Sequence, residues 1–233
     1  MKSNSLRLAA AFMLAALTTL ALAQGFTLKR AAKAGDTAKY RLKADIDVAG
    51  TSATFTAVLT EKILRVEDNG NYVVESNQTE GKVIFSGTEM PAPAQSPTVT
   101  IYRPTGEVAE IRGEVQDSSI YRIANLGLLR LPEKEMKTGE TWNHELKGDP
   151  KTGAVAVKAT YTIVGPEKIG EHETVKVKFD VSETEGAEKA SAAGHVWIDT
   201  KTGLMVQQEA EWKNAPFPGA PGPISAKIHI VKI

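Results

Sequence analysis

The stretch KAGDTAKYRLKADIDV, residues 33–48, decides the fold class of this chain. From residue 39 onward its apolar and polar side chains alternate, and the apolar members are Tyr40, Leu42, Ala44, Ile46 and Val48. A period of two predicts a β-strand with one buried and one solvated face. The alternation continues over 53–60, and the run DNGN at 68–71 favours a tight hairpin turn because Asn-Gly readily adopts positive φ angles. The sequence therefore predicts antiparallel strands that pair with their neighbours in the chain.

A second copy of this stretch, KTGETWNHELKGD, begins at Lys137. It repeats Lys, Gly, Thr, Leu, Lys and Asp at an offset of 104 residues from Lys33 (137 − 33). Further matches follow in the same order: 53–63 with 159–169, 79–81 with 184–186, and 105–106 with 202–203. Such collinear matches predict a duplicated unit, with copies over about 33–113 and 137–213. A β meander that reuses the same turn chemistry is the alternative.

Outside the two copies, the sequence predicts one helix and one terminal strand. The helix is expected over about 117–130, between the copies, with Asp117 or Ser118 as its N-cap and Leu131-Pro132 beyond its end. Residues 224–232 alternate like the first strand and are expected to close an edge of the sheet. The predicted fold class is mainly β: an antiparallel curved sheet or half-barrel from two duplicated units, with one helix between them, in a single domain over 24–233.

The N-terminus has the three parts of a secretory signal. Lys2 and Arg7 precede an apolar run over 8–22, and small residues surround Ala23. The run is shorter than the ~20 apolar residues that span a membrane. The sequence therefore predicts a signal peptide over 1–23, a periplasmic or secreted mature protein, and no transmembrane segment after signal cleavage. An uncleaved signal anchor is the alternative.

No residue pattern predicts catalysis, so we expect no enzyme, no metal site and no cofactor. A Gly-x-Ser-x-Gly elbow is absent, and cysteine is absent too. The histidines lack the spacing of metal ligands; they are His144, His172, His195 and His229. The pairs Asp45/Asp47 and Glu183/Glu185 are expected on solvated strand faces, without the Gly-centred loop of a calcium site. A formal net charge of zero gives no electrostatic reason to bind nucleic acid.

Aromatic and large apolar residues are the candidate ligand-binding residues. They are Phe55, Leu59, Trp142, Trp197, Trp212 and Ile228. A curved antiparallel sheet lined with such side chains could hold an apolar ligand in its concavity. The alternative is that the same side chains fill the core beneath the helix.

The segment VWIDTKTGLMV, residues 196–206, resembles a hairpin of bacterial extracytoplasmic proteins of the lipoprotein-carrier type (LolA/LolB-like). Leu131-Pro132 together with KTGETW at 137–142 is similar to a segment of uncharacterised secreted bacterial domains. The carrier resemblance implies a half-barrel of antiparallel strands, lidded by helices, that shelters acyl chains and does no chemistry. The apparent duplication and the single predicted helix depart from that family's pattern.

These observations predict a non-catalytic extracytoplasmic binding protein for an apolar or amphipathic, lipid-like ligand. The alternative is a structural or protein-binding module of the cell envelope that uses exposed sheet edges or the proline-rich loops at 91–97 and 216–223. A hydrolase would require His144 or His195 beside a carboxylate and a Ser or Thr in a cleft.

Overall fold

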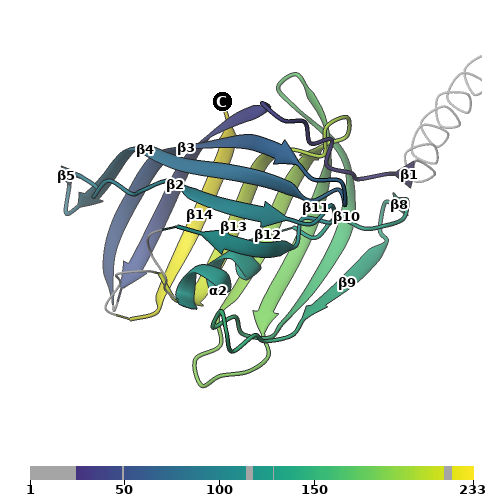
Figure 1. The fold of residues 1–233 in the computed structure, drawn as a ribbon. Coiled ribbons are helices and arrows are strands. Elements are labelled where there is room, and N and C mark those ends of the chain that lie inside the picture. Colours follow the sequence, from purple (N-terminus) through teal and green to yellow (C-terminus); the bar gives the residue numbers. More distant parts are fainter. Residues whose placement is uncertain (1–24, 49, 114–117, 128, 218–221) are drawn as a thin grey trace, which may run out of the picture.

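The computed structural model describes residues 25–48, 50–113, 118–127, 129–217 and 222–233. The predicted signal peptide over 1–23 and the predicted cap at Asp117 lie outside the described residues. Within them, the fold is mainly β with one helix, α2 (Ser118–Gly127), as the alternation predicted. The strands form a large antiparallel sheet that curves around α2 and is not closed into a barrel (Figure 1).

Twelve strands form this sheet. In chain order they are β2 (Thr37–Val48), β3 (Thr51–Val66), β4 (Tyr72–Phe85), β5 (Thr88–Pro91), β6 (Thr98–Tyr102), β7 (Val108–Arg112), β9 (Thr141–Leu146), β10 (Val157–Ile169), β11 (His172–Glu183), β12 (Ser191–Asp199), β13 (Met205–Ala215) and β14 (Ile224–Lys232). Across the sheet they run β7-β6-β4-β3-β2-β14-β13-β12-β11-β10-β9, and β5 pairs with β4. A separate small sheet pairs β1 (Gly25–Phe26) with β8 (Met136–Lys137).

The terminal strand does not close an edge, so that expectation was wrong. β14 pairs with β13 on one side and with β2 on the other, in the middle of the sheet. From Ile224 to Ile228 buried residues alternate with exposed ones, as expected. One face of β14 contributes Ala226 and Ile228 to the main core, and the other face is exposed. The edges are β7 and β9 instead.

The strands on either side of β14 form two halves with the same topology. The N-terminal half is β2, β3, β4, β6 and β7, and the C-terminal half is β9 to β13, each in chain order across the sheet. The turn before each first strand is also the same: Gly35 N donates to Ile63 O, and Gly139 N donates to Ile163 O, both at 2.8 Å. Each half therefore begins with the same hydrogen-bonded corner.

Two β-bulges of the N-terminal half have counterparts in the C-terminal half, while the register shift between Thr56 and Val58 has none in the pairing of β10 with β11. In the second and third strands the register shifts after Ile63 in one half and after Ile163 in the other. In the fourth and fifth strands it shifts after Ile101 and after Trp197. Because bulges bend a strand and increase its twist, matching bulges give the two halves matching curvature.

The hydrogen bonds correct the sequence alignment of the two copies. Ile63 corresponds to Ile163, not to Ile169, so the match of 53–63 with 159–169 is six residues out of register. An even shift leaves every side chain on the same face of a strand, and a period-two pattern cannot reveal it. The match of 79–81 with 184–186 also fails, since the first lies within β4 and the second follows β11.

The main core lies between the concave face of the C-terminal half and α2. Its fully buried side chains include Ile163, Val175 and Val177. Arg122 ties α2 to the sheet, because its Nε and Nη2 donate to the two carboxylate oxygens of Glu183 at 2.6 and 2.7 Å. Glu183 was expected on a solvated face, but its side chain is fully buried by this pair and by Ala190 N, which donates to it at 2.8 Å.

Candidate functional site

The concave face of the N-terminal half encloses a cavity of about 270 Å³, which we call the inner cavity. Its walls come from β2, β3, β4, β6 and the C-terminal half, and include Tyr40, Leu59, Glu61, Tyr72, Tyr102 and Ile198. The segment after α2 covers it through Leu129 and Leu131. Most of the lining is apolar, with a few polar groups, as is typical of small-molecule sites.

The side chains at matching register positions differ between the two halves. In the C-terminal half, Trp142, Tyr161 and Phe179 are neighbours on adjacent strands, and the rings of Trp142 and Tyr161 stack at 5.1 Å. The same register positions in the N-terminal half hold small or polar residues, namely Ala38, Glu61 and Ser76. Other positions differ in the opposite direction, since Tyr72 and Tyr102 take the register places of Val175 and Ile198. Side chains of both halves therefore border the cavity, Phe179 and Val196 among them.

The polar groups of the inner cavity are held largely out of water. Burial raises the pKa of Glu61 above its ordinary value, and the nearby Arg30 opposes that shift only in part. Burial raises the pKa of Tyr72 to about 12, and it raises the pKa of Tyr40 and of Tyr102 further. The three tyrosine hydroxyls therefore stay protonated at neutral pH and can donate hydrogen bonds to a ligand.

A second and larger cavity, of about 940 Å³, lies between the β6–β7 turn and β9; we call it the outer cavity. Arg30 and Leu131 border both cavities, so the two are adjacent. Six basic residues among those that the structure describes line the outer cavity: Lys29, Arg30, Arg103, Arg130, Lys134 and His144. Three of them come from different parts of the chain, Arg30 after β1, Arg130 after α2 and His144 in β9. Trp142 fixes the backbone there, because its Nε1 donates to Arg130 O at 2.9 Å.

The structure places two of the six predicted ligand-binding residues at these cavities. Leu59 lines the inner cavity and Trp142 lines the outer one. Phe55 is half-buried against the main core. Trp212 and Ile228 are buried in that core, and they border two other grooves, of about 740 and 470 Å³ respectively.

Trp197 lies on the opposite face of the sheet from the inner cavity. Its chain neighbours Val196 and Ile198 line that cavity, so alternation points Trp197 to the convex side. It is nevertheless only 4% exposed, and Lys176 Nζ lies 4.6 Å from its ring centre. Its burial thus comes from neighbouring side chains on that face.

Sequence reasoning missed Arg30, Glu61, Tyr72, Tyr102 and Arg130. Charged residues and tyrosines in strands or loops are ordinarily solvated, and nothing local marks these as buried. A signal existed in the comparison of the two copies, where Ala38 and Glu61 take the places of Trp142 and Tyr161. This signal becomes visible only when the second strands of the two halves are aligned with Glu61 opposite Tyr161.

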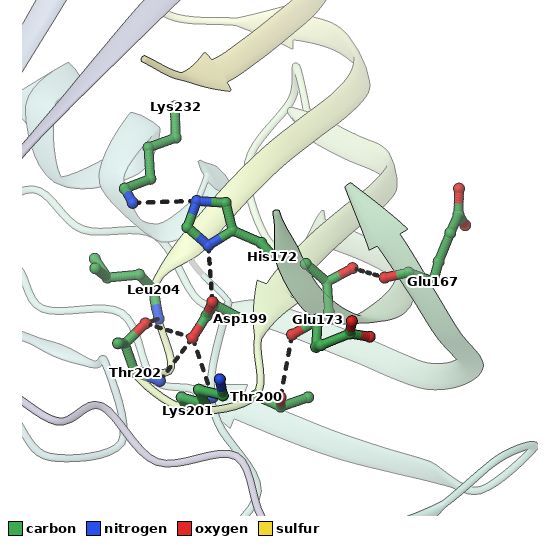
Figure 2. A network of polar contacts seen from close by, with 10 residues as sticks. Glu167, His172, Glu173, Asp199, Thr200, Lys201, Thr202, Leu204 and Lys232 are labelled. Carbon is green, nitrogen blue, oxygen red and sulfur yellow. Dashed lines mark hydrogen bonds and ion pairs between the residues drawn. The ribbon is translucent and has the colours of Figure 1, made fainter. Parts of the chain in front are cut away.

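A polar network joins the ends of β11, β12 and β14 (Figure 2). Lys232 Nζ lies 3.4 Å from His172 Nε2, and His172 Nδ1 lies 2.9 Å from Asp199 Oδ2. Lysine can only donate, so Nδ1 carries the proton that is donated to Asp199. Burial alone would raise the pKa of Asp199, but hydrogen bonds from His172 and from the Thr202 side chain and backbone hold it below its ordinary value. The hydrogen bonds of Asp199 to Lys201 N and Thr202 N stabilise the turn between β12 and β13.

The arrangement that a hydrolase would require was expected at His144 or His195. In the part of the chain that the structure describes, neither histidine has a carboxylate within hydrogen-bonding distance; His144 Nε2 is buried without a partner. The described residues also contain no group of three or more side chains able to hold a metal ion. No helix among them is both long and apolar enough to cross a membrane.

Comparison with known proteins adds a similarity to a solved structure. No family model matches the chain, and no curated protein matches it. A solved structure to which it is similar is that of the hypothetical lipoprotein YmcC from Escherichia coli (K12), with 11% sequence identity and a TM-score of 0.33. The alignment covers 100% of this chain and 96% of that one. The inner and outer cavities are therefore the basis for the proposed function.

Proposed function

We propose that this chain is a non-catalytic extracytoplasmic binding protein that holds the apolar part of a lipid-like ligand in the inner cavity. The observation that carries the proposal is a mostly apolar hollow at the concave face of the sheet. Side chains of both halves border it, among them Leu59 and Val196, and Leu129 and Leu131 cover it. An apolar hollow stabilises an apolar ligand by removing its surface from water, at roughly 25 cal/mol per Å².

The size of the inner cavity selects among apolar ligands. Its volume of about 270 Å³ lies just below the range for ligand pockets, roughly 300–1,000 Å³. We expect it to take one short hydrocarbon chain and not a lipid with two long chains. The signal-like N-terminus and the resemblance of 196–206 to lipoprotein carriers agree with an extracytoplasmic role of this kind.

The test uses decanol, a neutral ligand with one apolar chain. Calorimetric titration of the purified protein with decanol should give saturable binding, and displacement of the neutral dye Nile red should give the same affinity. The variant Ala38→Trp/Glu61→Tyr copies the aromatic pair of the C-terminal half. Glu61 lines the inner cavity, and Ala38 lies beside Glu61 at a neighbouring pocket of about 250 Å³. The variant should lose both signals while its circular dichroism stays that of the wild type.

The matched control adds the same two side chains to the other face of the same strands. Lys39 and Thr60 are the next cross-strand pair and point away from the cavity, so Lys39→Trp/Thr60→Tyr should bind decanol normally. The proposal fails if the wild type binds neither decanol nor Nile red and mass spectrometry finds no co-purified lipid.

A further inference from the structure

Arg130 is a buried cation whose hydrogen bonds are largely unmade. Its residue is 3% exposed, and its Nη1 donates to Gly106 O at 2.6 Å. Its Nε and Nη2 are buried and have no hydrogen-bond partner among the described residues. Buried guanidinium groups normally pair with a carboxylate, because an unpaired buried charge costs several kcal/mol. A buried arginine with two donor nitrogens that make no hydrogen bond is therefore unusual.

Two other nitrogen atoms at the same cavity share this condition. Arg30 Nη1 and His144 Nε2 are buried, and neither has a hydrogen-bond partner in the described part of the chain. Both residues line the outer cavity together with Arg130. Burial, and to a smaller extent the positive charge of Arg130, lower the pKa of His144.

The carboxylates of the outer cavity do not neutralise Arg130. Glu107 acts on it electrostatically, but its nearest ion pair is with Arg103, at 3.5 Å. Glu133 borders the same cavity and forms no ion pair within the described residues. Burial lowers the pKa of Arg130 below its ordinary value, as expected for a guanidinium without a carboxylate against it.

We propose that Arg130, Arg30 and His144 bind a carboxylate or phosphate group in the outer cavity, and that this group is the head of a single-chain amphiphile whose tail lies in the inner cavity. The inference rests on the proposed function and names its ligand class, an anionic amphiphile. A guanidinium with two free N–H groups matches the two oxygens of such an anion. The bond from Trp142 Nε1 to Arg130 O fixes the backbone that positions this guanidinium.

The geometry favours an amphiphile over a free anion. Arg30 and Leu131 border both cavities, so a head group held at Arg130 leaves its chain directed past Leu131 into the inner cavity. A chain there would replace water against apolar walls, whereas a free anion would gain only the polar contacts. The outer cavity would select ligands with an anionic head group, and burial of the tail in the inner cavity would stabilise the complex.

The test compares decanoate with decanol, which differ only in the head group, by calorimetric titration at pH 7. The wild type should bind decanoate about tenfold or more tightly than decanol, since a hydrogen bond to a charged group is worth that much. Arg130→Gln should remove most of this ratio and leave decanol affinity unchanged. His144→Gln should reduce the ratio by a smaller factor, because the amide N–H of glutamine replaces the imidazole N–H only in part. Arg65→Gln, an exposed arginine of β3 outside both cavities, should leave the ratio as in the wild type.

The outcomes separate this inference from the proposed function. Equal binding of decanoate and decanol by the wild type overturns the anion site and leaves the apolar cavity standing. Inorganic phosphate or acetate that binds as tightly as decanoate identifies a free-anion site and overturns the amphiphile. If Arg130→Gln does not fold, His144→Gln and the wild-type ratio decide. Failure of both decanol and decanoate to bind rejects the proposed function and the inference together.

Discussion

The two halves of the sheet share a backbone plan and differ in what fills it. Strand order, the hydrogen-bonded corner before the first strand and two pairs of bulges correspond. The C-terminal half holds Trp142, Tyr161 and Phe179 where the N-terminal half holds Ala38, Glu61 and Ser76, and the N-terminal half holds Tyr72 and Tyr102 where the C-terminal half holds Val175 and Ile198. The same strand plan thus carries more polar side chains on the concave face of the N-terminal half.

The first prediction compares the equivalent isoleucines of the two halves. Ile163 is 0% exposed within the continuous main core, and Ile63 is 2% exposed in a small cluster that borders a cavity. Ile163→Ala should lower the free energy of unfolding by about 4 kcal/mol and Ile63→Ala by about 2 kcal/mol, because the loss grows with the contacts removed. Urea denaturation measures both. Equal losses would show that the two halves are packed alike.

The second prediction concerns which half holds α2. Glu183→Ala removes the buried partner of Arg122 and should cost about 3 kcal/mol. On the N-terminal half, Ile111 N donates to the Tyr121 hydroxyl at 3.0 Å, and Tyr121→Phe should cost about 1 kcal/mol. Thermal unfolding followed by circular dichroism gives both values. A larger effect for Tyr121→Phe would assign the helix to the other half.

The third prediction compares equivalent turns. Asp199 Oδ1 accepts hydrogen bonds from Lys201 N and Thr202 N, whereas the matching position in the N-terminal half is Arg103, whose side chain pairs weakly with Glu107. Asp199→Ala should cost about 2 kcal/mol and Arg103→Ala less than about 0.5 kcal/mol.

The contribution of Asp199 should depend on pH in a defined direction. Its pKa is lowered in the folded protein, so its stabilisation is fully present above the ordinary aspartate pKa of about 3.9 and is lost as pH falls through the lowered value. The difference between wild type and Asp199→Ala should therefore shrink in acid. An unchanged difference at low pH would contradict this account.

The fourth and smallest effect concerns Glu61, which replaces Tyr161 in the N-terminal half. Because burial raises its pKa in the folded state, wild-type stability falls as pH rises from the ordinary glutamate pKa of about 4.3 through the raised value. Glu61→Gln should lack that slope and should be slightly more stable than the wild type at neutral pH. Tyr161→Phe is the matched control and should keep the wild-type slope. A slope in Glu61→Gln equal to the wild type would mean that this carboxyl is solvated.

The sequence predicted much of the fold but little of the candidate site. Alternation in 39–48 and 224–232 gave the strands β2 and β14 and the faces that they bury. Of the predicted ligand-binding residues, only Leu59 and Trp142 line the two cavities. Trp197 was grouped with them because aromatic residues are common at binding sites, and its place on the convex face depends on the register of β12.

Some features were beyond the sequence for a physical reason. The offset between the copies was misread by six residues because an even shift preserves the side-chain alternation. The central place of β14 depends on which strands it pairs with, and a terminal strand with one apolar face has the same pattern at an edge or in the middle. Burial of Arg130 depends on the β6–β7 turn and on β9, neither of which adjoins it in the chain.

The sequence by itself determined that this chain forms antiparallel strands with one apolar face, because the direction of a side chain from a strand is a local property of period two. Only the tertiary structure decided that side chains of both halves meet around a hollow, with a buried cation, Arg130, beside it. That outcome depends on the volumes and charges of side chains about 100 residues apart in the chain, which meet only when register and curvature are fixed.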